Sequence, residues 1–350
     1  MGIKPIQPEN IKRLLIRSTN WIGDAIMTTP AVRSIRDNFP QAHISLLAKP
    51  WVAPIFDNST HVDDVLICDG TARHKGFWGK WRLAKELRQY RFDAAILLQN
   101  AFEAALITFL AGIPLRIGYN TDARSLLLTH SVTCKPEFKK VHQTRYYLNI
   151  LREIGLKDAD PALYFVVSSK QRNRAKEILE KHGLSRSNNI VGINPSATFG
   201  PAKQWHPERF AKLADKIQEL SDFRILIFGG PEDRQLGREI AQMMNYAPLN
   251  LSGKTDLEEA MALIEQCRLF VTNDSGLMHV AAALNVPLVA VFGSTNSTTT
   301  GPLGSKSRVV KTSEACSPCL KPECPEGHLN CMDQIDVDMV FDVVKEMLRA

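Results

Sequence analysis

No stretch of this 350-residue sequence is long and apolar enough to cross a bilayer. The most apolar run, Ala104–Leu115, is interrupted by Gly112 and Pro114, whereas a spanning helix needs about 20 apolar residues. The first stretch, Met1–Leu15, contains prolines and polar residues where a signal peptide has its apolar core. We therefore expect a cytoplasmic protein, which can still touch a membrane surface.

Two common nucleotide-binding fingerprints are also missing. No Gly-x-Gly-x-x-Gly follows the first expected strand, and no Walker P-loop occurs anywhere in the sequence. These absences argue against a dehydrogenase and against a P-loop kinase. The composition, with 44% hydrophobic and 23% charged residues, is that of an ordinary globular protein, and the length predicts about two domains.

Short β-branched runs alternate with amphipathic helices along the whole chain, which predicts parallel sheets with right-handed crossovers and an α/β fold class. A proline-containing break at Lys157–Ala162 divides the chain into domains 1–160 and 161–350. In the first domain we expect strands at Arg13–Ser18, Ile44–Ala48, Val62–Cys68, Ala94–Leu98 and Leu115–Tyr119, with helices at Asp24–Phe39, Lys80–Tyr90, Phe102–Ala111 and His142–Ile154. In the second domain we expect strands at Asn189–Asn194, Phe223–Gly229, Leu269–Asn273 and Leu288–Phe292, a helix after Pro207, and another with a capping box at Thr255 and Glu258.

The charge is unevenly distributed between these domains. Residues 1–160 contain 22 basic against 15 acidic side chains, and the remainder of the chain is close to neutral. Such a basic half indicates an anionic partner, namely nucleic acid, anionic lipid or a phosphorylated substrate, unless it is only a solvated surface.

Ligands of open α/β sheets bind beyond the carboxyl ends of the strands, so the loops there are where chemistry is expected. After one strand, Ser275 and Gly276 would present backbone N–H groups at a helix start, with Asp274 before them and His279 one turn on. After another strand, Ser196, Thr198 and Lys203 could hold a diphosphate, with Trp205 bracing the loop. Taken alone, the first segment is also explained by a helix cap with a buried histidine, and the second by a surface turn.

Two further strand ends add to this pattern. In Gly229–Asp233 an acidic residue can accept both hydroxyls of a ribose. In Asn20–Pro30, Asp24 lies at an expected helix start that would face the partner domain, although capping that helix would also explain it.

With these segments the sequence resembles the bacterial ADP-heptose:lipopolysaccharide heptosyltransferases, most of all the heptosyltransferase II group. The resemblance covers nearly the whole chain and rests on Asn20–Asp24, on Phe199–Lys203 with Trp205, and on Asn273–His279. It implies the GT-B architecture, two Rossmann-like doubly wound domains facing a cleft, the first binding the acceptor and the second the donor. It further implies inverting transfer of heptose from ADP-L-glycero-β-D-manno-heptose to a heptose of the lipopolysaccharide inner core.

The resemblance also implies roles for single residues. Asp24 would be the general base, and Glu232 would hold the ribose. The diphosphate and the rest of the nucleotide would contact Ser196, Thr198, Lys203, Asp274, Ser275, Gly276 and His279. From their local context we assign Arg124 and Arg145 to acceptor binding. We expect no cofactor and no catalytic metal, because Lys203 and the helix dipole at Ser275–Gly276 can stabilise the leaving diphosphate.

The stretch Arg73–Arg82 interleaves cations with Phe77, Trp78 and Trp81, continuing to Lys85, Arg88 and Arg91. It predicts peripheral contact with the cytoplasmic face of the inner membrane and with the acceptor, unless the tryptophans pack into the core. Nucleic acid is not expected as a partner. The alternatives that remain are heptosyltransferase I or III, a nucleotide-sugar epimerase on the same fold, and a non-enzymatic binder of anionic glycolipid.

Four of the seven cysteines fall within one short segment. Clustered thiols in a cytoplasmic protein favour a small metal knuckle, most plausibly zinc, over disulfides. Reduced free thiols and a disulfide remain as alternatives, and His328 could replace one thiol as a ligand. The candidate structural ligands are Cys316, Cys319, Cys324 and Cys331.

Overall fold

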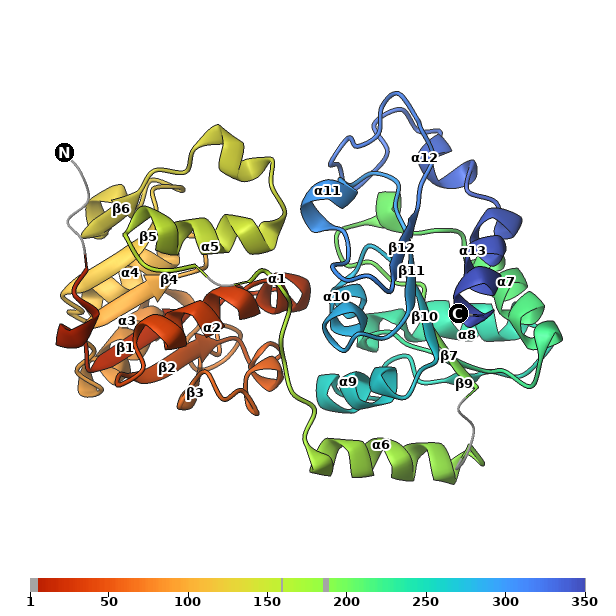
Figure 1. Ribbon diagram of the computed structural model, residues 1–350, viewed down its shortest axis with the longest axis horizontal. Coiled ribbons are helices and arrows are strands. Elements are labelled where there is room, and N and C mark those ends of the chain that lie inside the picture. The colour runs from red at the N-terminus through yellow and green to blue at the C-terminus, as the bar shows by residue number, and fades with distance from the viewer. Residues whose placement is uncertain (1–5, 159, 185–188, 350) are drawn as a thin grey trace. The chain divides into compact units, whose positions relative to one another are not determined.

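The computed structural model describes residues 6–158, 160–184 and 189–349, and it divides into two compact units (Figure 1). We call Met1–Val166 unit 1 and Val167–Ala350 unit 2. Met1–Pro5 and Ala159, which belong to the stretches used to exclude a signal peptide and to place the domain boundary, lie outside the described residues.

The division falls shortly after the boundary expected at residues 160/161, because hydrogen bonds tie the intervening chain to unit 1. Asn38 Nδ2 donates to the carbonyl of Lys157 (2.8 Å), and Arg33 donates to the carbonyl of Asp160 (2.7 Å). The Tyr164 N–H donates to Thr29 Oγ1 (3.0 Å). Residues up to Tyr164 are thereby held against a helix of unit 1.

Unit 1 is a six-stranded parallel sheet with the order β3-β2-β1-β4-β5-β6. Its strands are β1 (Arg13–Arg17), β2 (His43–Ala48), β3 (Asp64–Ile67), β4 (Ala94–Leu97), β5 (Leu115–Tyr119) and β6 (His130–Val132). Its helices are α1 (Ile22–Met27), α2 (Thr29–Asn38), α3 (Gly76–Gln89), α4 (Phe102–Leu110) and α5 (Gln143–Glu153). Helix α2 packs against α5, and α3 packs against α4. Right-handed crossovers put these two pairs on opposite faces of the sheet.

The helix expected over Asp24–Phe39 is two helices, because the chain breaks at Thr28. Pro30 has no N–H to continue the ladder, and the hydroxyl of Thr29 donates to the carbonyl of Ile26 instead (2.7 Å). The Thr28 hydroxyl likewise donates to the carbonyl of Ala25 (2.6 Å). As a result α1 is a short separate helix that begins directly after the β1 loop.

Unit 2 is a second six-stranded parallel sheet, with the order β12-β11-β10-β7-β8-β9. Its strands are β7 (Ile190–Asn194), β8 (Arg224–Ile227), β9 (Leu249–Asn250), β10 (Leu269–Asn273), β11 (Leu288–Val291) and β12 (Ser307–Val310). Its helices are α6 (Ser169–Lys181), α7 (Pro207–Leu220), α8 (Arg234–Met243), α9 (Leu257–Glu265), α10 (Gly276–Ala283), α11 (Ser297–Thr300), α12 (Asn330–Asp333) and α13 (Val337–Arg349). Figure 1 shows α9 and α10 on one side of this sheet and α7 and α13 on the other.

Two local predictions in unit 2 need correction. The capping box of α9 is formed by Asp256 and Glu259, one residue beyond the expected pair, because the Asp256 carboxylate accepts the N–H of Glu259 (2.8 Å). The sequence pattern also did not single out β9, β12, α6, α8, α11, α12 and α13. Of these, α6 packs against α9, with ion pairs of Arg172 with Glu265 and of Arg174 with Glu259.

Both units have the same strand order, 3-2-1-4-5-6 when the strands are numbered within each unit. This is the strand order of dinucleotide-binding folds. Successive strands are added in one direction from the first strand and in the opposite direction from the fourth, so the order reverses between these two neighbours. The reversal lies between β1 and β4 in unit 1 and between β7 and β10 in unit 2. Each sheet has its own buried core, and no helix among the described residues is long and apolar enough to cross a membrane.

Candidate functional site

The carboxyl ends of β7 and β10 lie side by side in the sheet of unit 2, with Asn194 opposite Thr272. Two buried asparagines connect the loops that follow these strands. Asn194 Nδ2 donates to Ser275 Oγ (2.8 Å), and Asn273 Nδ2 donates to the carbonyl of Pro195 (2.7 Å). Asn273 Oδ1 also accepts the N–H of Trp205 (3.1 Å). Both predicted nucleotide loops are therefore fixed to one point of the sheet, where ligands of such folds bind.

Lys203 and Asp274 form a largely buried ion pair at this point. Lys203 Nζ lies 2.7 Å from Asp274 Oδ2, with 15% and 6% of the two side chains exposed. The Thr295 hydroxyl donates to the same carboxylate oxygen (2.7 Å), and the Lys203 ammonium also lies 4.9 Å from the centre of the Phe199 ring. The sequence placed both residues in one site but did not predict that they pair with each other.

The Ser196 hydroxyl contacts the third predicted loop. Ser196 Oγ donates to Asp233 Oδ1 (2.6 Å), and the other oxygen of Asp233 accepts the N–H of Gly230 (2.7 Å). Asp233 thus links the β7 loop to the β8 loop, a role that the sequence did not single out. Glu232, the expected ribose ligand, is exposed beside it.

The remaining predicted nucleotide residues lie on the same loops. Ser275 caps α10 by accepting the N–H of Met278 (3.3 Å), Gly276 is the first helical residue, and His279 is buried in the next turn. Thr198 is exposed on the β7 loop, while Trp205 is buried and donates to the carbonyl of Ile335 (2.7 Å). Trp205 therefore braces the loop as expected.

In unit 1, Asp24 lies after β1 in the first turn of α1 and is half-buried. Helix α1 begins at Ile22 with Trp21 at its N-cap, so Asp24 is two residues further into the helix than expected and is not its cap residue. Burial, and then the negative charge of Asp24, raise the pKa of Tyr147 on α5 well above its usual value. Helix α1, which carries Asp24, packs against α5, which carries the buried Tyr147.

Arg124 does not have the exposure expected of an acceptor ligand. Its side chain is fully buried, and it donates to the carbonyls of Tyr119 (2.7 Å) and Gln99 and to Asn100 Oδ1 (3.2 Å). Burial lowers its pKa to about 10. In this structure the guanidinium connects the loops after β4 and β5.

Arg145 is partly exposed at the start of α5. Its guanidinium lies 3.6 Å from the carboxylate of Asp158, which is also paired with Arg152. A surface pair of this kind is weak and leaves the side chain free to move.

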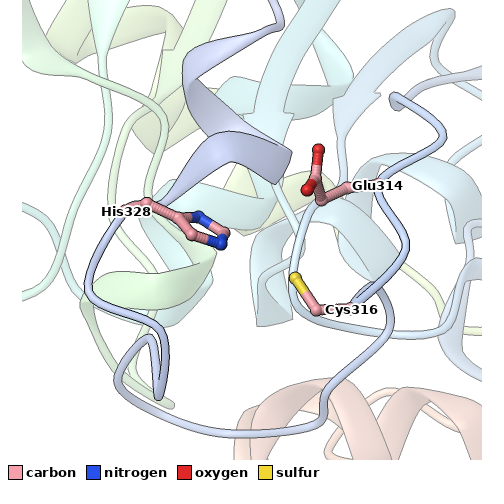
Figure 2. A group of neighbouring side chains, drawn as sticks. All are labelled: Glu314, Cys316 and His328. Carbon is pink, nitrogen blue, oxygen red and sulfur yellow. The ribbon is translucent and has the colours of Figure 1, made fainter.

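The cysteine segment after β12 brings a different ligand set together from the one expected. Metal-binding atoms of Glu314, Cys316 and His328 lie within 4.8 Å of one another (Figure 2). Figure 2 shows Glu314 and Cys316 on one stretch of this loop and His328 facing them from the other. Cys319, Cys324 and Cys331 are free thiols in the same segment, and Cys331 is buried at α12.

Helix α3 presents the predicted aromatic and basic residues to solvent. The exposed fractions are 65% for Phe77, 76% for Trp78 and 49% for Trp81. Gly79, Leu83, Ala84 and Leu87 form the buried face of this helix. The alternative that the tryptophans pack into the core is therefore wrong. We call Lys75, Phe77, Trp78, Trp81, Arg82 and Lys85 the α3 surface.

Two doubly wound parallel units, each with polar loops where its strand order reverses, define the GT-B class of glycosyltransferases. Residues 80–330 match the model of glycosyltransferase family 9 (heptosyltransferase), and the chain belongs to this family. It is 30% identical to lipopolysaccharide heptosyltransferase 2 of Escherichia coli strain K12, over 96% of this chain and 98% of that protein. It is 32% identical to lipooligosaccharide heptosyltransferase 2 of Haemophilus influenzae strain Rd, over 96% and 99%.

Solved structures agree with this assignment. The E. coli ADP-heptose lps heptosyltransferase II structure superposes with a TM-score of 0.79 at 29% identity, covering 96% of this chain and 98% of that one. A family 9 glycosyl transferase from Veillonella parvula DSM 2008 superposes with a TM-score of 0.88 at 24% identity, covering 99% of both chains, and supports the fold. The chain is accordingly a glycosyltransferase of the heptosyltransferase family.

Proposed function

We propose that this enzyme transfers heptose from ADP-L-glycero-β-D-manno-heptose to a heptose of the lipopolysaccharide inner core, with inversion at the anomeric carbon. Unit 2 binds the donor and unit 1 binds the acceptor. The observation that carries the proposal is the convergence of Lys203, Ser196 and the N-terminus of α10 at the strand-order reversal of unit 2. The printed names of the full-length relatives support the choice of heptose and of lipopolysaccharide.

The diphosphate of the donor is bound by Lys203 and by the N-terminal end of α10. The backbone N–H groups that follow Ser275 carry the positive end of the helix dipole, and Gly276 lets a phosphate approach closely. Ser196 and Thr198 add hydroxyl donors, Glu232 accepts the ribose hydroxyls, and His279 completes the nucleotide site. Charge that develops on the leaving diphosphate is stabilised where these donors converge.

Asp274 gives this site a switch between two pairings of Lys203. Before the donor binds, the Asp274 carboxylate neutralises the ammonium, which limits the cost of keeping that charge largely buried. A bound diphosphate takes over the ammonium, and the Thr295 hydroxyl continues to satisfy Asp274. Asp274 therefore positions Lys203 and is not itself a phosphate ligand.

Asp24 acts as the general base that removes the proton from the attacking hydroxyl of the acceptor. It follows β1, at the strand-order reversal of unit 1, and it is only partly buried, so a substrate hydroxyl can reach it. We retain Arg145 as a candidate for the acceptor phosphates, whereas the buried Arg124 is assigned a positioning role in the loops around it.

The α3 surface binds the anionic membrane surface that carries the acceptor. Its aromatic rings can enter the headgroup region, and Lys75, Arg82 and Lys85 can meet lipid phosphates. Phe77, Trp78, Trp81 and Lys85 follow helical spacing on the side of α3 that faces away from the core. This face explains how an enzyme without a spanning helix among its described residues reaches a lipid-linked substrate.

Incubation of the protein with ADP-heptose and a panel of truncated lipopolysaccharides, with mass spectrometry of the products, tests the proposal. We expect one added heptose on the acceptor that ends in a single inner-core heptose. Addition to an acceptor that lacks any heptose would identify heptosyltransferase I activity, and addition only to a longer core would identify heptosyltransferase III activity. Conversion of the donor without an acceptor would identify an epimerase.

A further inference from the structure

The cysteine segment, Glu314–Cys331, lies outside the proposed catalytic machinery yet concentrates groups that bind soft metals. Glu314, Cys316 and His328 already place one ligand atom each within 4.8 Å of the others. Cys319, Cys324 and Cys331 supply three further thiols in the same segment, all free of disulfides. Thiolate, imidazole and carboxylate ligands together are typical of zinc sites, with four ligands in a tetrahedron.

The backbone of this segment contains two leucines in an uncommon conformation. Leu320 and Leu329 have positive φ angles (58° and 52°), which residues with a side chain rarely adopt. Leu320 directly follows Cys319, and Leu329 directly follows His328. The Leu329 N–H also donates to Cys324 Sγ (3.4 Å), which orients that sulfur. Strained positions persist where the surrounding structure determines them, and they gather at functional sites.

The same segment is built onto the loop that carries Lys203. The carbonyl of Pro322 accepts the N–H of Ala202 (3.0 Å). Gly200 approaches so closely that a Cβ at its position would lie 2.4 Å from that carbonyl oxygen. The Leu320 N–H donates to the carbonyl of Ser294 (2.8 Å), next to the Thr295 that bonds Asp274. The cysteine segment therefore contacts Ala202 and Ser294, the residues next to Lys203 and Thr295.

We propose that Glu314–Cys331 binds one zinc-class metal ion through Glu314, Cys316 and His328, with one neighbouring thiolate as fourth ligand, and that this ion holds the Gly200–Lys203 loop in place. The ion has a structural role, because four protein ligands leave no open position for a substrate. The binding site itself does not depend on the proposed function.

Metal binding at His328 has a specific consequence for the Asn330 amide. The Asn330 N–H donates to His328 Nδ1 (3.0 Å). When a metal binds either ring nitrogen, Nδ1 carries the metal or the ring proton, so this hydrogen bond ends. The amide resonance of Asn330 should therefore shift when the ion binds, whereas that of His182, the C-cap of α6, should not.

Elemental analysis of the untagged protein, purified without chelators, is the first measurement. We expect roughly one zinc ion per chain, as for a four-ligand site. Cys316→Ser and His328→Ala should each lose most of this metal, whereas Cys134→Ser and His182→Ala, outside the segment, should keep it. In the wild-type protein, replacement by cobalt(II) should give the sulfur-to-metal absorption of a thiolate complex, a readout that does not depend on any variant folding.

Hydrogen exchange tests the connection to the Lys203 loop without using activity. Removal of the metal by a chelator should speed exchange of the Ala202 amide, while amides of β4 in unit 1 keep their protection. A metal content far below one ion per chain, together with no cobalt absorption, would overturn the proposal of a metal site. Metal kept by His328→Ala but lost by Cys331→Ser would replace this ligand set with the four thiols, and unchanged Ala202 exchange would overturn the bracing role.

Discussion

At the scale of single residues, the ion pair between Lys203 and Asp274 is the central feature of the proposed nucleotide site. A lysine alone in a phosphate loop would be a permanent positive charge, but this one is neutralised by a carboxylate at 2.7 Å. A substitution at Lys203 therefore also leaves the Asp274 carboxylate without this partner, and the measured change in binding free energy includes that effect. This distinguishes the pair from the exposed pair of Lys216 and Asp338 in the same unit, also at 2.7 Å.

Lys203→Ala should weaken ADP binding by roughly 10- to 150-fold, the equivalent of a lost charge-assisted hydrogen bond of about 1.5–3 kcal/mol. The unpaired Asp274 then repels the diphosphate, so the double variant Lys203→Ala/Asp274→Asn should recover part of the loss. Calorimetry on the four proteins of this double-mutant cycle measures the coupling. Lys216→Ala is the matched control and should bind ADP normally. Wild-type affinity in Lys203→Ala would contradict the assignment.

Asp24→Asn should fold and bind ADP normally but lose roughly 10²- to 10⁴-fold in turnover, the usual contribution of a general base. The removed charge also lies in the first turn of a helix, where an acidic side chain adds about 0.3–1 kcal/mol of stability. Glu258→Gln, in the first turn of α9, controls for that effect and should keep full activity. Thermal unfolding of both variants measures the effect on helix stability, and steady-state rates measure the effect on catalysis. Near-normal turnover in Asp24→Asn would show that Asp24 has only a structural role.

The sequence indicated which loops hold these residues but not how the side chains pair. Lys203, Ser196 and Asp274 could be placed after strands because buried strands have a recognisable apolar pattern. The contact of Ser196 with Asp233 joins positions far apart in the chain, and no local pattern specifies it. The burial of Arg124 was not predicted for the same reason. Its three acceptors, two carbonyls and one side-chain oxygen, are set by the fold, and nothing in the local sequence around the arginine indicates them.

At the scale of elements, helix α3 carries apolar side chains on both its buried face and its exposed face. One face buries Leu83 and Leu87 against the sheet, and the other exposes two tryptophans and a phenylalanine. Contiguous exposed apolar groups of this kind mark interaction surfaces. Their mixture with cations favours an anionic lipid surface over a protein partner.

Charge reversal at Lys75, Arg82 and Lys85 together should reduce sedimentation with anionic vesicles and raise the apparent KM for lipopolysaccharide, with ADP affinity unchanged. Lys80 is left intact because it pairs with Glu103 (2.9 Å). Each effect should shrink as salt rises, since exposed charges are screened over about 10 Å at 0.1 M ionic strength. Reversal of the exposed Lys170, Lys181 and Lys212 in unit 2 changes the net charge equally and should have no effect. Equal vesicle binding by both triple variants at low salt would rule this surface out.

Most strands and helices followed from the sequence, because parallel strands buried on both faces read as continuous apolar runs. Strands β6, β9 and β12 and helices α6, α8, α11, α12 and α13 were not predicted from the sequence, and the helix expected over Asp24–Phe39 is two helices. The break between α1 and α2 depends on hydroxyls of Thr28 and Thr29 that replace ladder bonds near Pro30, and a proline near the start of a helix is equally compatible with an unbroken one. Helix α6 was missed because few of its residues are apolar and ion pairs supply much of its contact with α9.

At the scale of the whole molecule, the chain consists of two units with one strand order and separate cores. All residues assigned to the donor lie in unit 2, and Asp24 and the α3 surface lie in unit 1. We therefore predict that donor binding can be separated from transfer by dividing the chain.

Residues 167–350 expressed alone should fold and bind ADP with an affinity within a few-fold of the whole enzyme, because the nucleotide loops make their described contacts within unit 2. The fragment should transfer no heptose, since the base and the acceptor surface are absent. Circular dichroism and calorimetry check folding and binding. A fragment that is folded but does not bind ADP would show that unit 1 contributes to the nucleotide site.

The neutralised Lys203 also has a kinetic consequence. Long-range attraction of an anionic ligand depends on unpaired charge, and a close pair of opposite charges produces a field that falls off quickly. The association rate of ADP-heptose should then depend only weakly on salt. Asp274→Asn leaves the ammonium unpaired, so this variant should capture the donor faster at low salt and lose that advantage as salt is added.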